Sequence, residues 1–218
     1  RTQGHPVADW PVLVAVGEET RCSADVLAVV VGQTQAAALA GAAEVTVEAE
    51  ALAPITLADG VTIDEHSLER GAAASGGRTV SGTFTTAPAD PGYLEPDAAL
   101  AVPLAEGFVV YGTGQDPFAD RQQLAALIGV ETDAIEIRTV PCGGAFGGRS
   151  EIGVQAHALL AASKLRRPVR LVLTHRETVR MHPGRPGAQV EASLTADDAG
   201  RLQSLSVALT VDSGGYAS

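Results

Sequence analysis

The chain has 218 residues, of which 45% are hydrophobic, and a formal net charge of −11 at pH 7. The apolar content suffices for a globular core, whereas the negative charge and the lack of a Lys/Arg-rich block argue against a nucleic-acid or anionic-membrane partner. No apolar run approaches the ~20 residues of a membrane span, and the first residues do not resemble a signal peptide. Cys22 and Cys142 lie too far apart for a typical metal motif, so we expect a soluble protein of the reducing cytoplasm.

Hydrophobic patterns predict the elements of the first part of the chain. Residues 26–31 form a continuous apolar, β-branched run and residues 45–50 alternate, so both are expected to be strands. Between them, the alanine-rich residues 35–43 are expected to form a helix with Thr34 as its N-cap. Residues 56–78 are rich in glycine and show no sustained period, which predicts a linker between two domains.

Strands and helices alternate in the rest of the chain. Strands are expected at 79–86, 108–112, 135–140 and 169–173, and a hairpin at 190–194 and 202–211. One helix is expected to begin at Pro117, with Asp116 as its N-cap, and to end at Gly129. Another, with Ile152 and Leu159 on its apolar face, is expected after the 135–140 strand. Because the alternation lacks a strict βαβ rhythm, we predict an α+β or mixed α/β fold.

The most unusual stretch is a glycine-dense loop, Gly-Gly-Ala-Phe-Gly-Gly at 143–148, between a predicted strand and a predicted helix. The simplest interpretation is that the glycines let the strand turn sharply into the helix. However, a turn needs fewer of them, because each ordered glycine costs conformational entropy and leaves backbone uncovered. Uncovered N–H groups near a helix N-terminus can bind the oxygens of a large polar ligand. The loop is therefore a candidate binding site.

The same loop, extended to Arg149 and Ser150, differs at one position from the phosphate-binding pattern Gly-x-x-x-x-Gly-Lys-Ser. This similarity keeps a nucleotide-binding enzyme open as an alternative function. Against it, the lysine of that pattern is a compact charge that reaches the phosphates, and a planar guanidinium does not replace it simply.

Five segments in order resemble the molybdenum-binding subunit of the xanthine dehydrogenase and aldehyde oxidase family. They are residues 12–55, GYLEPDAALA at 92–101, TGQDPF at 113–118, GGAFGGR at 143–149 and AGRLQSLSVALTVDSGGYAS at 199–218. The resemblance implies that residues 1–55 are the end of a small hammerhead-like α/β domain. It also implies a linker at 56–78 and the first part of a molybdopterin-binding domain at 79–218. The chain starts without Met and stops just after a strand-like run, so we expect it to be part of a longer protein.

The resemblance implies roles for individual residues. The carboxamide of Gln115 would hydrogen-bond an oxygen ligand of the molybdenum, and the loop backbone would line the cofactor. The implied cofactor-binding residues are Gln115, Gly143, Gly144, Ala145, Phe146, Gly147 and Gly148. The implied substrate-binding candidates are Phe146, Arg149, Ser150, Glu151 and Arg185. No residue is assigned as a direct metal ligand or as a catalytic residue.

Departures from the family pattern leave the substrate open. The family commonly has a glutamate directly after the loop's Gly-Gly-Lys or Gly-Gly-Arg, whereas this chain has Ser150 there and Glu151 one position later. A shift of one residue at a helix start rotates a side chain by about 100°, so Glu151 is not expected to point into the same pocket as the family's glutamate.

We expect Ser150 to cap the following helix, and we expect Glu95 to be a structural hydrogen-bonding residue. His157 is expected to be a structural or exposed histidine.

The resemblance implies a parent enzyme that hydroxylates an aldehyde or an N-heterocycle such as a purine at a molybdopterin–molybdenum centre, with water as the oxygen source. Electrons would leave through iron–sulfur and FAD partners on other domains or subunits. The family's general-base glutamate lies on a segment outside these residues, so the chain by itself is expected neither to bind the cofactor tightly nor to turn over. A family fold that acts only as an assembly or interaction module stays open as a second alternative.

Overall fold

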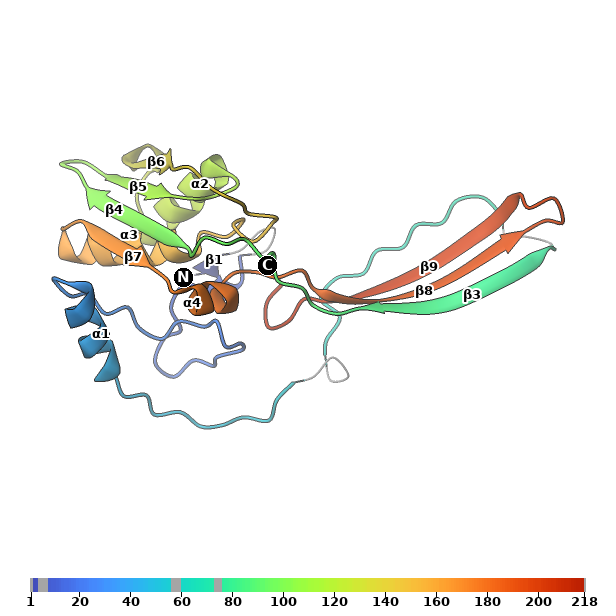
Figure 1. Ribbon diagram of the computed structural model, residues 1–218, viewed down its shortest axis with the longest axis horizontal. Coiled ribbons are helices and arrows are strands. Elements are labelled where there is room, and N and C mark those ends of the chain that lie inside the picture. The colour runs from blue at the N-terminus through green and yellow to red at the C-terminus, as the bar shows by residue number, and fades with distance from the viewer. Residues whose placement is uncertain (1, 4–7, 56–59, 73–75, 218) are drawn as a thin grey trace. The chain divides into compact units, whose positions relative to one another are not determined.

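The computed structural model of the protein describes residues 2–3, 8–55, 60–72 and 76–217. The chain forms two compact units that do not follow the sequence order (Figure 1). The first unit comprises residues 1–50, 90–184 and 215–218, and the second comprises residues 51–89 and 185–214. Each unit has its own β-sheet, and the glycine loop belongs to the first.

The main sheet of the first unit has four strands in the order β6-β5-β4-β7. They are β4 (Ala98–Pro103), β5 (Phe108–Gly112), β6 (Ile135–Thr139) and β7 (Val169–Val172). β4 is antiparallel to both neighbours, whereas β5 and β6 are parallel because helix α2 (Pro117–Ile128) carries the chain from one to the other. Helix α3 (Gly153–Leu165) follows the glycine loop. This mixed sheet with helices confirms the predicted fold class.

The core of the first unit lies between this sheet and helices α2 and α3. Ala99 and Ala101 of β4 are 4% and 0% exposed and are packed with Ala156 of α3, which is 0% exposed. Small side chains on both elements allow the helix to approach the sheet closely. Leu124 of α2 and Ile135 of β6 are fully buried in the same core. The core therefore fixes the ends of β5 and β6, which Gln115 and the glycine loop follow in the chain.

Shorter elements complete the first unit. They are the two-stranded ladder of β1 (Thr2–Gln3) and β2 (Trp10–Pro11), helix α1 (Gln35–Ala43), the 3₁₀ turn Thr132–Ala134 and helix α4 (His175–Met181). α4 begins with a reciprocal capping box between Thr174 and Glu177, a start signal that is present in the sequence. In the described part of the chain, no helix combines the length and apolarity needed to cross a membrane.

Asp25 ties the N-terminal segment of the first unit to residues near the C-terminus. Its carboxylate accepts hydrogen bonds from Trp10 Nε1 at 3.1 Å, from the Tyr216 hydroxyl at 2.9 Å and from the backbone N–H of Arg21 at 2.6 Å. The rings of Trp10 and Tyr216 stack with their centroids 5.6 Å apart. Segments almost 200 positions apart in sequence are thereby held together around one carboxylate.

Most predicted elements are confirmed, but two strands are wrong. The helix at 35–43, the Asp116 and Gly129 boundaries of α2, the strands of the second half and the hairpin are present as predicted. Residues 26–31 and 45–50 form no strand, so the expected strand–helix–strand unit reduces to a helix. A strand needs a neighbouring strand to pair with, and within the described residues neither run has one. β4 and α4 were not predicted.

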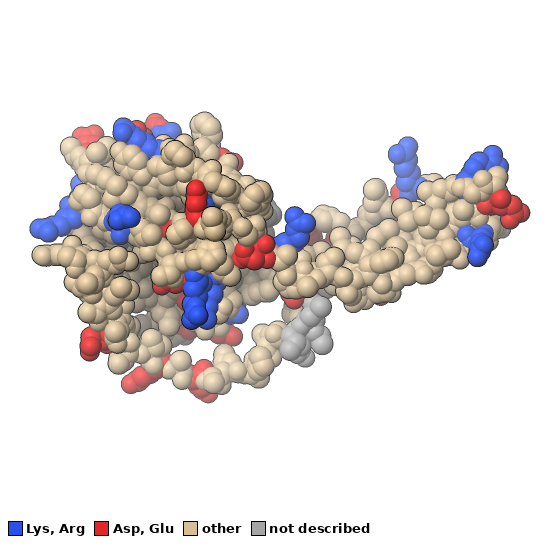
Figure 2. All heavy atoms as spheres, in the orientation of Figure 1, with Lys and Arg blue, Asp and Glu red and all other residues tan. Residues whose placement is uncertain are grey.

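The second unit contains a three-stranded antiparallel sheet in the order β3-β8-β9. Its strands are β3 (Arg78–Thr86), β8 (Gly187–Ala196) and β9 (Leu202–Asp212). Their register aligns apolar side chains on one face and Thr and Ser on the other. The large exposed members of the apolar face are Val80, Phe84, Leu194, Leu205, Val207, Leu209 and Val211. In Figure 2 charges are sparse along this sheet and gather at its tip.

This exposed apolar face predicts self-association of the chain in water, because contiguous apolar surface drives association. Replacing Val207 and Leu209 together by lysine is expected to shift the sedimentation profile towards monomer and to lower binding of a hydrophobic dye. The control is Ser206→Lys with Thr210→Lys, which adds the same charge to the opposite face of β9. Equal effects of the two pairs in analytical ultracentrifugation would contradict the prediction.

Candidate functional site

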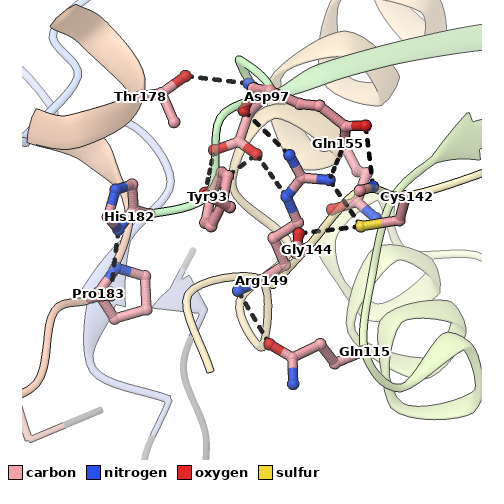
Figure 3. A network of polar contacts seen from close by, with 12 residues as sticks. Tyr93, Asp97, Gln115, Cys142, Gly144, Arg149, Gln155, Thr178, His182 and Pro183 are labelled. Carbon is pink, nitrogen blue, oxygen red and sulfur yellow. Dashed lines mark hydrogen bonds and ion pairs between the residues drawn. The ribbon is translucent and has the colours of Figure 1, made fainter. Parts of the chain in front are cut away.

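Gln115 and Arg149 join the end of β5 to the glycine loop. The backbone N–H of Gln115 donates to the carbonyl oxygen of Arg149 at 3.1 Å, and the backbone N–H of Arg149 donates to Gln115 Oε1 at 3.2 Å. Because a backbone N–H can only donate, the second bond fixes the carboxamide with Oε1 towards Arg149 and the NH₂ group turned away (Figure 3). Gln115 is exposed, so this NH₂ group presents two donors to a ligand.

The side chain of Arg149 lies in the protein interior, at the centre of a group that we call the Arg149 cluster: Tyr93, Glu95, Asp97, Cys142 and Arg149. Figure 3 shows Tyr93, Asp97 and Cys142 around Arg149. The side chain is 2% exposed and its Nε lies 3.1 Å from Asp97 Oδ1. Nη2 donates to the backbone oxygen of Glu95 at 3.1 Å, and Nη1 lies 3.0 Å from Cys142 Sγ. The guanidinium carbon stands 4.2 Å from the centroid of the Tyr93 ring. All three guanidinium nitrogens therefore have a partner in the protein, although Nε is held by its ion pair with Asp97 and not by an aligned hydrogen bond.

Asp97 is the more buried of the two countercharges of Arg149; the other, Glu95, is half-exposed, and its Oε2 lies 3.4 Å from Nη1. Burial raises the pKa of Asp97 above its ordinary value, although a hydrogen bond from Tyr93 and the charges of Arg149 and His182 act in the opposite direction. Its backbone N–H donates to the hydroxyl of Thr178 on α4 at 2.9 Å, so α4 helps to position this carboxyl group. A buried pair of this kind is costly to break, because removing one charge leaves the other uncompensated.

Close packing requires glycine at two positions of the loop, in addition to the candidate role of the loop in binding. A Cβ atom on Gly148 would lie 2.8 Å from Pro91 Cγ and 2.9 Å from Tyr93 Cε1, and one on Gly143 would collide with the Glu95 carboxylate. The backbone N–H of Gly143 donates to that carboxylate at 2.8 Å, which confirms the structural role expected for Glu95. The glycine loop thus packs directly on residues 91–95, a contact that no pattern in the sequence indicates.

Phe146 is held in an unusual conformation at the tip of the loop. Its φ angle is +51° and its side chain is 74% exposed. A left-handed conformation costs a non-glycine residue about 1 kcal/mol or more, and such strain concentrates at ligand sites. Among the described residues, no acceptor binds the backbone N–H of Ala145, Phe146 or Gly147. The tip therefore combines an exposed ring with N–H groups that can bind a ligand.

The remaining substrate candidates lie in different environments. Ser150 is exposed and its hydroxyl donates to the carbonyl oxygen of Gly147 at 2.8 Å, so the expected capping role is wrong; Ile152 occupies the N-cap position of α3. Glu151 lies beside a cavity of about 30 Å³ that is also lined by Thr113, Arg149 and Gln155. Arg185 belongs to the second unit, where its backbone pairs with Ala89.

The geometry does not favour a nucleotide-binding loop. The cation that would reach the phosphates, Arg149, is turned into the protein and engaged by Asp97, Glu95 and Cys142. Helix α3 begins only at Gly153, four residues after Arg149.

In the described part of the chain, no group of three His, Cys, Asp or Glu side chains is placed to hold a metal ion. His157 is a structural histidine as expected: it is 2% exposed, and its Nε2 lies 2.7 Å from the carbonyl oxygen of Val12.

Comparisons with known proteins agree on one family. Residues 56–218 match the family model of the molybdopterin cofactor-binding domain. The chain is 36% identical over 126 residues to a probable xanthine dehydrogenase subunit of Bacillus subtilis, a match that covers 57% of this chain and 17% of that protein. It is 27% identical over 236 residues to the nicotinate dehydrogenase large molybdopterin subunit of Eubacterium barkeri, with 97% of this chain and 54% of that subunit covered.

The fold is also similar to that of solved enzymes. Aldehyde oxidoreductase from Desulfovibrio gigas superposes with a TM-score of 0.61 at 22% identity, covering 63% of this chain and 15% of that protein. The chain thus spans from about one sixth to about half of the length of the proteins it matches. Because the family model matches well over half of the chain, this protein belongs to the molybdopterin cofactor-binding domain family.

Proposed function

We propose that the chain is part of a molybdenum hydroxylase that oxidises an aldehyde or an N-heterocycle such as a purine, with water as the source of the oxygen. The observation that carries this proposal is the fixed carboxamide of Gln115 beside the open glycine loop. The names of similar proteins support the substrate class: xanthine dehydrogenase, nicotinate dehydrogenase and indole-3-acetaldehyde oxidase.

The residues of the loop fit a large, acceptor-rich cofactor. The NH₂ group of Gln115 donates without adding charge, and the N–H groups of Ala145, Phe146 and Gly147 point to no acceptor in the described residues. A molybdopterin bears many oxygen and nitrogen acceptors, for which such donors are suited. On this ground we assign Gln115 and the backbone of residues 145–147 to cofactor binding, whereas the N–H groups of Gly143 and Gly148 are used within the protein and support the loop.

The cofactor supplies two-electron redox chemistry when it is bound. The role of this chain is to position the cofactor and the substrate and to exclude water. Gln115 places two donors at a fixed point, and the exposed ring of Phe146 offers a flat wall to a planar substrate. Because the guanidinium of Arg149 is fully engaged, we assign it to supporting the loop rather than to contacting substrate. Ser150 and Glu151 stay candidates for substrate contact.

Electrons would leave through iron–sulfur and FAD groups on other domains or subunits. The matched proteins are several times longer than the aligned segment or are named as subunits, which supports an assembly of several parts. Neither a nucleotide-binding enzyme nor a purely structural module is favoured by these similarities.

Gln115 provides the direct test of this function. In the complete molybdenum enzyme, Gln115→Ala is expected to lower kcat about 100-fold or more, because one fixed donor to the reacting centre contributes on that scale. Because Gln115 is assigned to cofactor binding, kcat is expressed per bound molybdenum in each preparation, and the affinity for substrate is expected to stay unchanged. Gln35→Ala, on the exposed surface of α1, is the control. An unchanged kcat in Gln115→Ala would remove Gln115 from the site.

The chain alone is expected to hold little cofactor. Since the matched proteins are much longer, further cofactor contacts and the family's general base come from other segments. Elemental analysis of the purified 218-residue chain should therefore find far less than one molybdenum per chain, and no hydroxylase turnover. The complete subunit purified in the same way is the control. Stoichiometric molybdenum in the short chain would contradict this expectation.

A further inference from the structure

A buried carboxyl group, Asp120, lies directly behind the segment that presents Gln115. Asp120 is in the first turn of α2 and is 1% exposed. Its Oδ2 accepts a hydrogen bond from Gln155 Nε2 of α3 at 3.3 Å. Its Oδ1 is buried and has no hydrogen-bond partner among the described residues. A carboxyl group in this position is outside the Arg149 cluster and outside every role assigned above.

Two glycines make room for this Asp–Gln pair. A Cβ atom on Gly114 would collide with Asp120 Oδ2, and one on Gly112 would lie 2.9 Å from Gln155 Cγ. The carboxyl and carboxamide groups therefore pack against the backbone of residues 112–114, immediately before Gln115. A movement of the Asp120 carboxyl group towards Gly114 would displace this glycine and, through it, the N–H of Gln115 that binds Arg149.

The surroundings of Asp120 oppose its ionisation. An ionised carboxylate with an unpaired buried oxygen is costly, whereas the protonated group is neutral and can donate. The charged groups that act on it are both acidic: Asp116 from its own helix and Glu151 from the loop before α3. α3 contributes the neutral Gln155, and no cation of the described residues pairs with Asp120. Burial is the main reason that the pKa of Asp120 is raised to about 7; the hydrogen bond from Gln155 acts in the opposite direction, and the two carboxylates add to the effect of burial.

We propose that Asp120 is a positioning residue: its protonated carboxyl group, packed between α2, α3 and Gly114, holds Gln115 in place, and its ionisation displaces Gln115. Gln155 connects this carboxyl group to the small cavity beside Glu151, through which a proton can exchange with water. The claim that this displacement weakens cofactor binding rests on the proposed function. The claim that Gln115 moves does not depend on it.

The experiment follows the side-chain NH₂ resonances of Gln115 by NMR in the ¹⁵N-labelled 218-residue chain between pH 5 and pH 9. Their loss in Gln115→Glu assigns them. We expect them to shift with a midpoint near neutrality in the wild-type chain and to stay constant in Asp120→Asn. Asp133→Asn, which changes a 97%-exposed aspartate in the same unit, is the control and should titrate like the wild type.

Two outcomes would overturn the proposal: constant Gln115 resonances in the wild-type chain, or an unchanged titration in Asp120→Asn. If that variant fails to fold, ¹³C NMR of the Asp120 carboxyl group in the wild-type chain decides, and a midpoint near its ordinary value of 3.8 would also overturn it. These measurements use the chain without cofactor, so a negative result would count against the proposal for Asp120 and not against the hydroxylase function.

Asp120 also predicts how stability depends on pH. The folded chain keeps the proton up to about pH 7, whereas the unfolded chain loses it near 3.8, so stability falls as pH rises between these values and then stays level. Asp120→Asn removes this loss. Unfolding followed by the fluorescence of Trp10, in the first unit, should show a Tm several degrees above wild type at pH 8 and a similar Tm at pH 4. An equal difference at both pH values would contradict the assignment.

Discussion

The buried ion pair between Arg149 and Asp97 is the interaction on which the candidate site depends. It connects the glycine loop to residues 91–97 and, through Thr178, to α4. The same residue, Arg149, uses its backbone to hold Gln115 at the end of β5. One residue therefore fixes three separate segments, and its side chain and backbone do so in different directions (Figure 3).

These contacts explain why the loop contains so many glycines. Gly143 and Gly148 are needed because the loop packs on Glu95, Pro91 and Tyr93 without room for a Cβ atom. Only the tip of the loop, with the exposed ring of Phe146, is free to face a ligand. A loop that is rigid at its base and open at its tip is suited to binding a cofactor with little loss of conformational entropy, because its backbone is already ordered.

Two buried polar side chains lie behind the candidate site. The carboxyl group of Asp120 and the carboxamide of Gln155 lie where a sheet end meets two helices, a place that apolar side chains usually fill. Gly112 and Gly114 leave the space they occupy. Burial of a titratable group at this point couples the local protonation state to the geometry of Gln115.

The sequence by itself determined the local elements, the glycine loop and the family resemblance, because caps, periodicity and short motifs are written in neighbouring residues. It therefore predicted the boundaries of α2, the 108–112 strand and the hairpin. It could not decide whether residues 26–31 and 45–50 pair with another strand, since pairing depends on distant partners. Only the tertiary structure showed that Arg149 turns inward and that Asp120 lies behind Gln115, because burial and charge pairing arise between segments far apart in the chain.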